Sequence, residues 1–218
     1  MKIVSAFRNI DRNLPTAIFI RHGEKCVTSS VENDAHTPLS INGIISSSQL
    51  GERLMAIGCN ISKIMSSPVQ RCLHTAQILI KGNRSNLSIE EDYILKHAFI
   101  ENPERAYEVF CTLQMSDIVR KQVMHEDLNG FRSIFEGSTS LVNLAISRFE
   151  GNKTDIYITH DLLLTTLFFA LTNTKAEKIE GEWFDYLDGI CLQLIEKDKL
   201  RICRETQVFD FYSKFQLS

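Results

Sequence analysis

Three short stretches of the chain are rich in apolar and β-branched residues and lack regular alternation with polar ones. They are residues 16–20 (TAIFI), residues 61–65 (ISKIM) and residues 154–158 (TDIYI). Each is followed at once by polar residues or a proline. Runs of this kind are typical of strands that are buried on both faces of a parallel sheet. The pattern therefore predicts three strands, of which the first and the third are expected to be buried.

Apolar residues recur at helical spacing in the segments that follow these runs. Residues 37–58 are predicted to form a helix that starts near the cap-like Thr37 and stops at Gly58. Residues 69–82 are predicted to form a second helix, closed by its last glycine, and residues 162–173 a third. Strands that alternate with helices predict right-handed crossovers and an α/β fold.

The expected architecture is a three-layer sandwich with a mostly parallel central sheet and helices on both faces. Residues 189–206 add a predicted hairpin around a Lys-Asp-Lys turn. Residues 83–153 show weak strand signals and two helical stretches, so we expect a helical insertion over the active-site edge of the sheet. The sequence has no repeats or linkers, which predicts a single domain over residues 1–218.

The composition and net charge of the chain limit the classes of partner and the cellular compartment that we expect. The chain has 218 residues and a net charge of −3, and this lack of basic excess argues against nucleic acid or an anionic membrane as the main partner. Its six cysteines form no CxxC pair, which favours isolated reduced thiols. The first residues lack the apolar core of a secretory signal, and the longest apolar run is too short to span a bilayer. These features predict a cytoplasmic protein.

Three polar motifs follow the three predicted strands: RHGE at 21–24, SSPVQR at 66–71 and THD at 159–161. Ligands of open α/β sheets bind beyond the carboxyl ends of the strands, so these motifs should meet at one edge. Arginine forks match phosphate oxygens, and a histidine among them can act as a nucleophile or an acid/base. The candidates for such an anion site are Arg21, His22, Arg71, His160 and Asp161.

Each motif alone also fits an ordinary structural role. His22 could be a turn histidine, Arg71 a surface arginine and Asp161 the N-cap of the following helix. Ser66 and Ser67 are expected to shape a strand end rather than to act as nucleophiles, and Tyr186 is expected in the core or in a substrate wall, like Trp183 and Phe184. The order of the three motifs and their shared position after strands favour a common site.

The sequence resembles the histidine phosphatase superfamily, which has the phosphoglycerate-mutase-like fold. The resemblance lies in FIRHGEK, TPLSINGIISSSQLGERL, SSPVQRCLHTAQIL, IYITHD and YLDGICLQL, and it covers most of the chain except roughly residues 83–153. It implies a metal-independent phosphomonoester hydrolase that needs no cofactor. His22 would form a phosphohistidine, while Arg21, Arg71 and His160 hold the phosphate oxygens. Gly23 would allow a tight turn and offer its carbonyl to His22.

The resemblance leaves the proton donor open. One branch of the family carries a glutamate in a pattern like L-x-E, but in this chain that position falls on His97, and Glu101 follows four residues later. Another branch uses an aspartate directly after its second histidine, which is Asp161 here, and carries a further basic residue near the position of Lys25. We favour Asp161 over Glu101, although an aspartate bound by backbone N–H groups is a poorer acid. His97 is the third candidate, as an acid or a phosphate ligand.

Two other functions fit the same sequence. A catalytically weak relative that binds a phosphorylated metabolite or protein is the first, because the glutamate is missing. A phosphomutase is the second, although mutases of the family are usually longer and keep that glutamate. In every case the partner is a phosphorylated small molecule or a phosphoprotein, selected by the insertion at 83–153. The sequence does not indicate the substrate or the oligomeric state.

Overall fold

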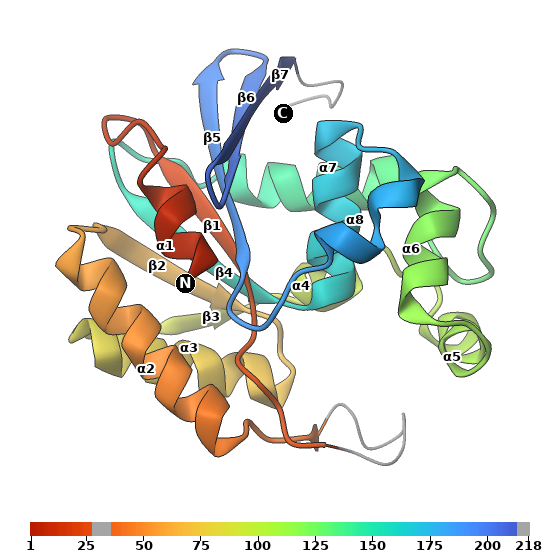
Figure 1. Cartoon of the computed structure of the whole chain (residues 1–218), viewed down its shortest axis with the longest axis horizontal. Helices are drawn as coiled ribbons and strands as arrows, with labels where there is room; N and C mark the ends of the chain where they lie inside the picture. The colour runs from red at the N-terminus through yellow and green to blue at the C-terminus, as the bar shows by residue number, and fades with distance from the viewer. Residues whose placement is uncertain (28–35, 213–218) are drawn as a thin grey trace.

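A computed structural model, which describes residues 1–27 and 36–212, shows one seven-stranded mixed sheet (Figure 1). The strand order is β3-β2-β4-β1-β5-β6-β7. The first four strands in this order are parallel, and β5, β6 and β7 continue from β1 in antiparallel fashion. The predicted α/β class is therefore confirmed. The strands are β1 (Thr16–Arg21), β2 (Ile61–Ser66), β3 (Ile89–Glu91), β4 (Thr154–Thr159), β5 (Gly189–Glu196), β6 (Lys199–Arg204) and β7 (Gln207–Tyr212).

Helices cover both faces of this sheet. One layer holds α1 (Lys2–Phe7), α2 (Ile41–Ala56) and α3 (Gln70–Asn83). The other holds α4 (Ile94–His97), α5 (Pro103–Thr112), α6 (Met115–Val123), α7 (Ile134–Ile146) and α8 (Asp161–Thr172). Two 3-10 turns, η2 (Ala176–Lys178) and η3 (Glu180–Glu182), lead from α8 to β5.

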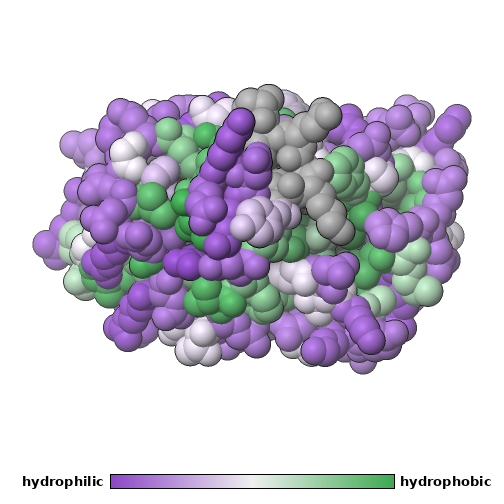
Figure 2. Space-filling model, turned by 90° about the horizontal axis from the view of Figure 1, so that it is seen from above, coloured by the Kyte–Doolittle hydropathy of each residue, from purple (hydrophilic) through white to green (hydrophobic). Residues whose placement is uncertain are grey.

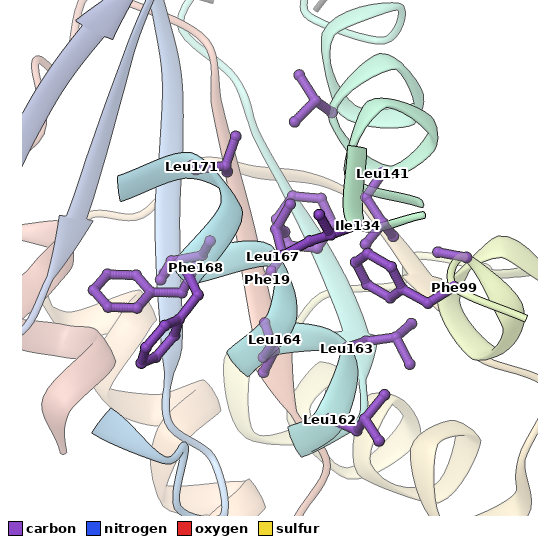
Figure 3. Close-up of a cluster of buried hydrophobic side chains, with 14 of the residues drawn as sticks. Phe19, Phe99, Ile134, Leu141, Leu162, Leu163, Leu164, Leu167, Phe168 and Leu171 are labelled. Atoms are coloured by element: carbon purple, nitrogen blue, oxygen red, sulfur yellow. The ribbon is translucent and has the colours of Figure 1, made fainter. Parts of the chain in front are cut away.

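Strand β1 joins the two cores that lie between these layers. Phe19 points into the core shared with α4 to α8, whereas Ile18 and Ile20 point into the core shared with α1 to α3. Figure 3 shows the first core, where leucines of α8 surround Phe19. Burying one such side chain stabilises the fold by about 1.5–3 kcal/mol, so β1 is a rigid support for the residues at its end.

The N-terminus of α2 differs from the sequence prediction in a way that concerns the site. Its N-cap is Ser40 rather than Thr37, and the Ser40 hydroxyl accepts from the Gly43 N–H at 3.0 Å. The same hydroxyl donates to Glu24 at 2.7 Å. Serine and threonine both cap helices well, so their residue types do not distinguish Ser40 from Thr37. The contact of Ser40 with Glu24 in the loop after β1 favours Ser40 as the N-cap. The cap thereby ties α2 to the segment that follows Arg21.

Helix α3 passes through Gly82, where the sequence predicted its end. It closes instead at Arg84, whose φ of 58° lies in the left-handed region. A Cβ at Gly82 would stand 2.3 Å from the Ser48 carbonyl of α2, so the glycine allows the two helices to approach closely. Gly82 is therefore a packing residue and not a helix stop.

The segment 83–153 is mainly helical but begins with β3 at the sheet edge. The Leu95 carbonyl of α4 accepts from the Thr159 hydroxyl at 2.6 Å, which places α4 beside the end of β4. Helices α6 and α7 pack against α8 in the layer on one face. The short elements α1, β3 and β7 were not predicted from the sequence.

No helix in the described part of the chain has the length and apolar character needed to cross a membrane. Figure 2 looks at the molecule from above the view of Figure 1, and hydrophilic residues cover much of the visible face. Hydrophobic residues lie between them in small patches.

Candidate active site

The three motifs meet at the carboxyl edge of the parallel strands. In the register of the sheet, Arg21 lies opposite Thr159, and Ser66 lies opposite Ile158. The next residues of the three strands therefore leave the sheet together. The described structure brings Arg21, His22, Arg71, His160 and Asp161 into one connected set of side chains.

His22 is almost fully buried, with 2% of its surface exposed, and both ring nitrogens have partners. Its Nε2 accepts from Arg71 Nε at 2.9 Å, and its Nδ1 lies 2.8 Å from the Gly23 carbonyl. Since arginine can only donate, Nε2 must be the unprotonated nitrogen and Nδ1–H must donate to the carbonyl. The ring is thus held in the tautomer whose Nε2 carries the lone pair, and that lone pair accepts the hydrogen bond from Arg71.

Two electrostatic effects keep both histidines neutral. Burial lowers the pKa of His22 well below its ordinary value, and the proximity of His160 and of the Arg71 guanidinium lowers it further. Burial also lowers the pKa of His160, with Arg71 as the next largest cause. The two rings lie 5.5 Å apart, centroid to centroid. A neutral imidazole is the nucleophilic form, so this environment favours His22 as a nucleophile.

The turn at Gly23 fixes the position of His22 against α2 and α3. The Gly23 N–H donates to the Thr75 hydroxyl at 2.9 Å, and that hydroxyl donates to the Arg71 carbonyl at 2.7 Å. A Cβ at Gly23 would stand 2.7 Å from the hydroxyl oxygen of Ser47. Glycine therefore permits the close approach that places His22 beside Arg71.

Arg71 connects the two histidines. It is 7% exposed, and besides its bond to His22 it donates through Nη2 to His160 Nδ1 at 3.3 Å. The other His160 nitrogen, Nε2, lies 2.9 Å from the Ser67 hydroxyl. Ser67 was expected only to shape the end of β2, but it also orients His160. Nothing in the sequence around Ser67 distinguishes this role from that of a strand-end serine.

Arg21 is engaged on three sides. Its Nη1 donates to the Phe184 carbonyl at 2.7 Å, and its Nη2 forms an ion pair with Asp161 Oδ2 at 2.7 Å. The guanidinium carbon stands 4.1 Å from the ring centroid of Tyr186. The buried Nε of Arg21 has no hydrogen-bond partner among the described residues.

Asp161 is the first residue of α8, with His160 as the N-cap. Besides the ion pair with Arg21, its Oδ1 accepts from the Leu162 N–H at 2.8 Å. The helix thus begins one residue earlier than expected, and the carboxylate both contacts the site and binds a helix N–H. Asp161 is the one donor candidate with a direct bond to the phosphate-site candidates in the described structure.

The other candidates lie at different distances from this set. Burial lowers the pKa of Lys25, and the charge of Arg71 lowers it further, which places Lys25 within electrostatic reach. Burial and then Lys96 lower the pKa of His97, and His97 in turn lowers that of His160. Glu101 is exposed, and its backbone N–H bonds to Gly130. In the described structure its carboxylate makes no hydrogen bond or ion pair with the other candidates.

The neutral histidines should make the fold sensitive to acid. On unfolding, each can take up a proton at any pH below its ordinary pKa of about 6.5. The unfolded chain then binds more protons, so the free energy of unfolding should fall as pH drops below about 6.5, by up to about 1.4 kcal/mol per pH unit for each histidine. Urea denaturation at about pH 7.5 and about pH 5.5 measures this. The variant His160→Gln should show a shallower dependence, and an unchanged slope would contradict the assignment.

Comparison with known proteins finds one matching family model and several solved structures with a similar fold. Residues 17–100 match the model of the histidine phosphatase superfamily (branch 1). A comparison with curated proteins finds no match. Among solved structures, Bacillus stearothermophilus YhfR has a TM-score of 0.61 and 20% identity, over 89% of this chain and 98% of that one. A phosphoserine phosphatase from Entamoeba histolytica has a TM-score of 0.56 and 19% identity, over 82% and 90%.

A mycobacterial glucosyl-3-phosphoglycerate phosphatase, bound to inorganic phosphate, has a TM-score of 0.60. It is 16% identical over 93% of this chain and 99% of that one. At such identities these likenesses establish the shared fold. The matched family segment contains RHGE and SSPVQR, whereas THD lies outside it.

Proposed function

We propose that the chain is a phosphatase of the histidine type, which hydrolyses phosphomonoesters without a metal through a phosphohistidine on His22. The match of residues 17–100 to the model of the histidine phosphatase superfamily supports this. One observation carries the proposal. The Nε2 lone pair of a buried, neutral His22 is held beside the Arg71 guanidinium, while the ring proton is bound by the Gly23 carbonyl.

The first chemical step is transfer of the phosphoryl group to His22. The Nε2 lone pair forms a bond to phosphorus as the bond from phosphorus to the ester oxygen breaks. The departing oxygen takes a proton from a carboxylic acid and leaves as an alcohol. The hydrogen bond from Nδ1 to the Gly23 carbonyl stabilises the positive charge that develops on the ring.

The arginines and His160 supply the charge that holds the three remaining phosphate oxygens. Arg71 is already in contact with both histidines, and Arg21 would exchange Asp161 for a phosphate oxygen at Nη2. A bound phosphate dianion favours protonation of His160, in which form both ring nitrogens donate. In this scheme the protein itself provides the electrostatic stabilisation of the transition state, so the reaction needs no metal.

The second step returns His22 to its starting state. The carboxylate left by the first step takes a proton from water, the water oxygen attacks phosphorus, and the bond from phosphorus to Nε2 breaks. Inorganic phosphate then leaves, with the lone pair restored to His22. We assign the carboxyl group to Asp161 because its 2.7 Å contact with Arg21 places it beside the phosphate-site candidates. The substrate phosphate would displace Asp161 from Nη2 of Arg21, and the carboxylate released from that ion pair would take up the proton that it then gives to the ester oxygen.

Replacement of Asp161 tests this assignment through the leaving group. The variant Asp161→Asn should lose about 10²- to 10⁴-fold in kcat on alkyl phosphates, whose alkoxide needs a proton. It should lose far less on p-nitrophenyl phosphate, because nitrophenolate leaves without one. Steady-state kinetics on both substrate types measures the difference.

Glu101→Gln and His97→Gln are the matched controls for that experiment. Neither should show the dependence on the leaving group. If Glu101→Gln shows it and Asp161→Asn does not, then Glu101 is the donor and the assignment to Asp161 is wrong. The same reasoning applies to His97.

The substrate class is drawn from the fold relatives. The structural neighbours include phosphatases named for phosphoserine and for glucosyl-3-phosphoglycerate. We propose that this chain likewise acts on a phosphorylated small molecule or on a phosphorylated protein side chain. The segment 83–153 contributes to selecting it, because α4 lies beside the end of β4.

A further inference from the structure

The segment between η3 and β5 is bound to the backbone on both sides of Arg21. The Arg21 N–H donates to the Asp188 carbonyl at 2.9 Å, and the Leu187 N–H donates to the Arg21 carbonyl at 3.2 Å. Leu187 has a φ of 58°, which leucine rarely adopts, so tertiary contacts hold this turn. The turn is therefore rigidly placed at the edge of the site.

The hydrophobic side chains of this segment do not share one environment. Phe184 is 0% exposed and Leu187 is 5% exposed, and both belong to the hydrophobic cores. Tyr186, in contrast, is 38% exposed. Its ring lies over the Arg21 guanidinium at 4.1 Å and stands 5.8 Å from the His22 ring, tilted by 47°. An exposed aromatic surface is thus fixed directly beside the nucleophile.

The position of this ring across the sheet defines what it can contact. The strand order places the end of β1, with His22, between the end of β4, with His160, and the start of β5. The rings of His160 and Tyr186 lie 5.5 Å and 5.8 Å from the His22 ring, centroid to centroid. An ester whose phosphorus reaches His22 Nε2 would bring its organic group within reach of the exposed part of the Tyr186 ring.

We propose that Tyr186 is a specificity-determining residue, which favours phosphomonoesters whose leaving group carries a flat aromatic ring. This inference rests on the proposed function and names the substrate class that the site prefers. An aromatic pair adds a favourable contact beyond the burial of area, through offset or edge-to-face packing. A saturated ring of the same size gains the burial but not this contact. The preference should be about three- to tenfold in affinity.

The test compares benzyl phosphate with cyclohexylmethyl phosphate, which are closely matched in size and in the alcohol they release. Each is measured as a competitive inhibitor of p-nitrophenyl phosphate hydrolysis. The wild-type protein should bind the benzyl ester about three- to tenfold more tightly. Tyr186→Ala should abolish this preference, and Tyr186→Phe should keep it because the ring remains. Tyr212→Ala, which removes an exposed tyrosine of β7, is the control and should keep it too.

Two results would overturn the inference. One is a wild-type protein without a preference for the benzyl ester. The other is Tyr186→Ala weakening both esters equally, which would mean that the ring only orients Arg21. Failure of the proposed function gives a different result. In that case p-nitrophenyl phosphate would be hydrolysed equally by the wild type and by His22→Ala, or not at all.

Discussion

Replacing His22 by alanine should reduce phosphomonoester hydrolysis by at least about 10⁴-fold, because the covalent route through Nε2 is lost. The remaining site still binds phosphate, so inhibition by product or thermal stabilisation by phosphate should persist in part. The measurement is kcat on p-nitrophenyl phosphate, with near-ultraviolet circular dichroism to show that the variant is folded.

The control for His22→Ala is His125→Asn. His125 is exposed and has a left-handed backbone with a φ of 58°, which asparagine tolerates. This control should retain full activity. Activity that survives in His22→Ala would contradict the proposed nucleophile. Phosphate binding by a wild-type protein without any turnover would instead identify a catalytically weak phosphate-binding relative.

Replacing Arg71 by glutamine should be the next most severe change, with a loss of about 10³-fold in kcat. Arg71 is the only described residue that donates hydrogen bonds to both His22 and His160. Its guanidinium would also stabilise charge on the transferring phosphoryl group. Glutamine keeps a donor of similar shape but removes the positive charge, so phosphate affinity should fall together with kcat.

Arg71→Lys separates charge from geometry. Lysine restores the charge but cannot bond to both histidines with a planar fork, so it should recover only a small part of the loss. Arg201→Gln is the matched control, because Arg201 forms a bidentate pair with Asp210 between β6 and β7. It should leave kinetics unchanged. A folded Arg71→Gln variant with nearly normal kcat would show that Arg71 does not stabilise the transition state.

The regular part of the fold was predictable because its signal is local. Residues 17–20 are continuously apolar, and the structure buries β1 on both faces. The elements that escaped prediction lack such a signal. Strand β3 has three residues of intermediate or high exposure, and β7 alternates between intermediate and exposed positions. These are edge strands, and pairing with a neighbour rather than their own pattern defines them.

The part of the candidate site that was predictable consists of side chains that belong to the three sequence motifs. Arg21, His22 and Arg71 follow recognisable strands, and parallel strands end at the same edge. Other parts depend on tertiary structure alone. The Phe184 carbonyl is a backbone group without any side-chain signature, and Tyr186 reaches Arg21 because β5 pairs with β1. The sequence allowed Asp161 to be either a helix cap or an acid, and the structure shows it in contact both with a helix N–H and with Arg21.

The most direct test of the account is to trap the phosphorylated protein. After rapid acid-free quenching of a reaction with a phosphomonoester, intact-mass and peptide analysis should find one phosphoryl group on His22. The modification should be labile in acid and stable in base, and it should be absent from His22→Ala. Hydrolysis that proceeds while no phosphoryl group can be found on the protein, or a phosphoryl group on another residue, would contradict the central claim.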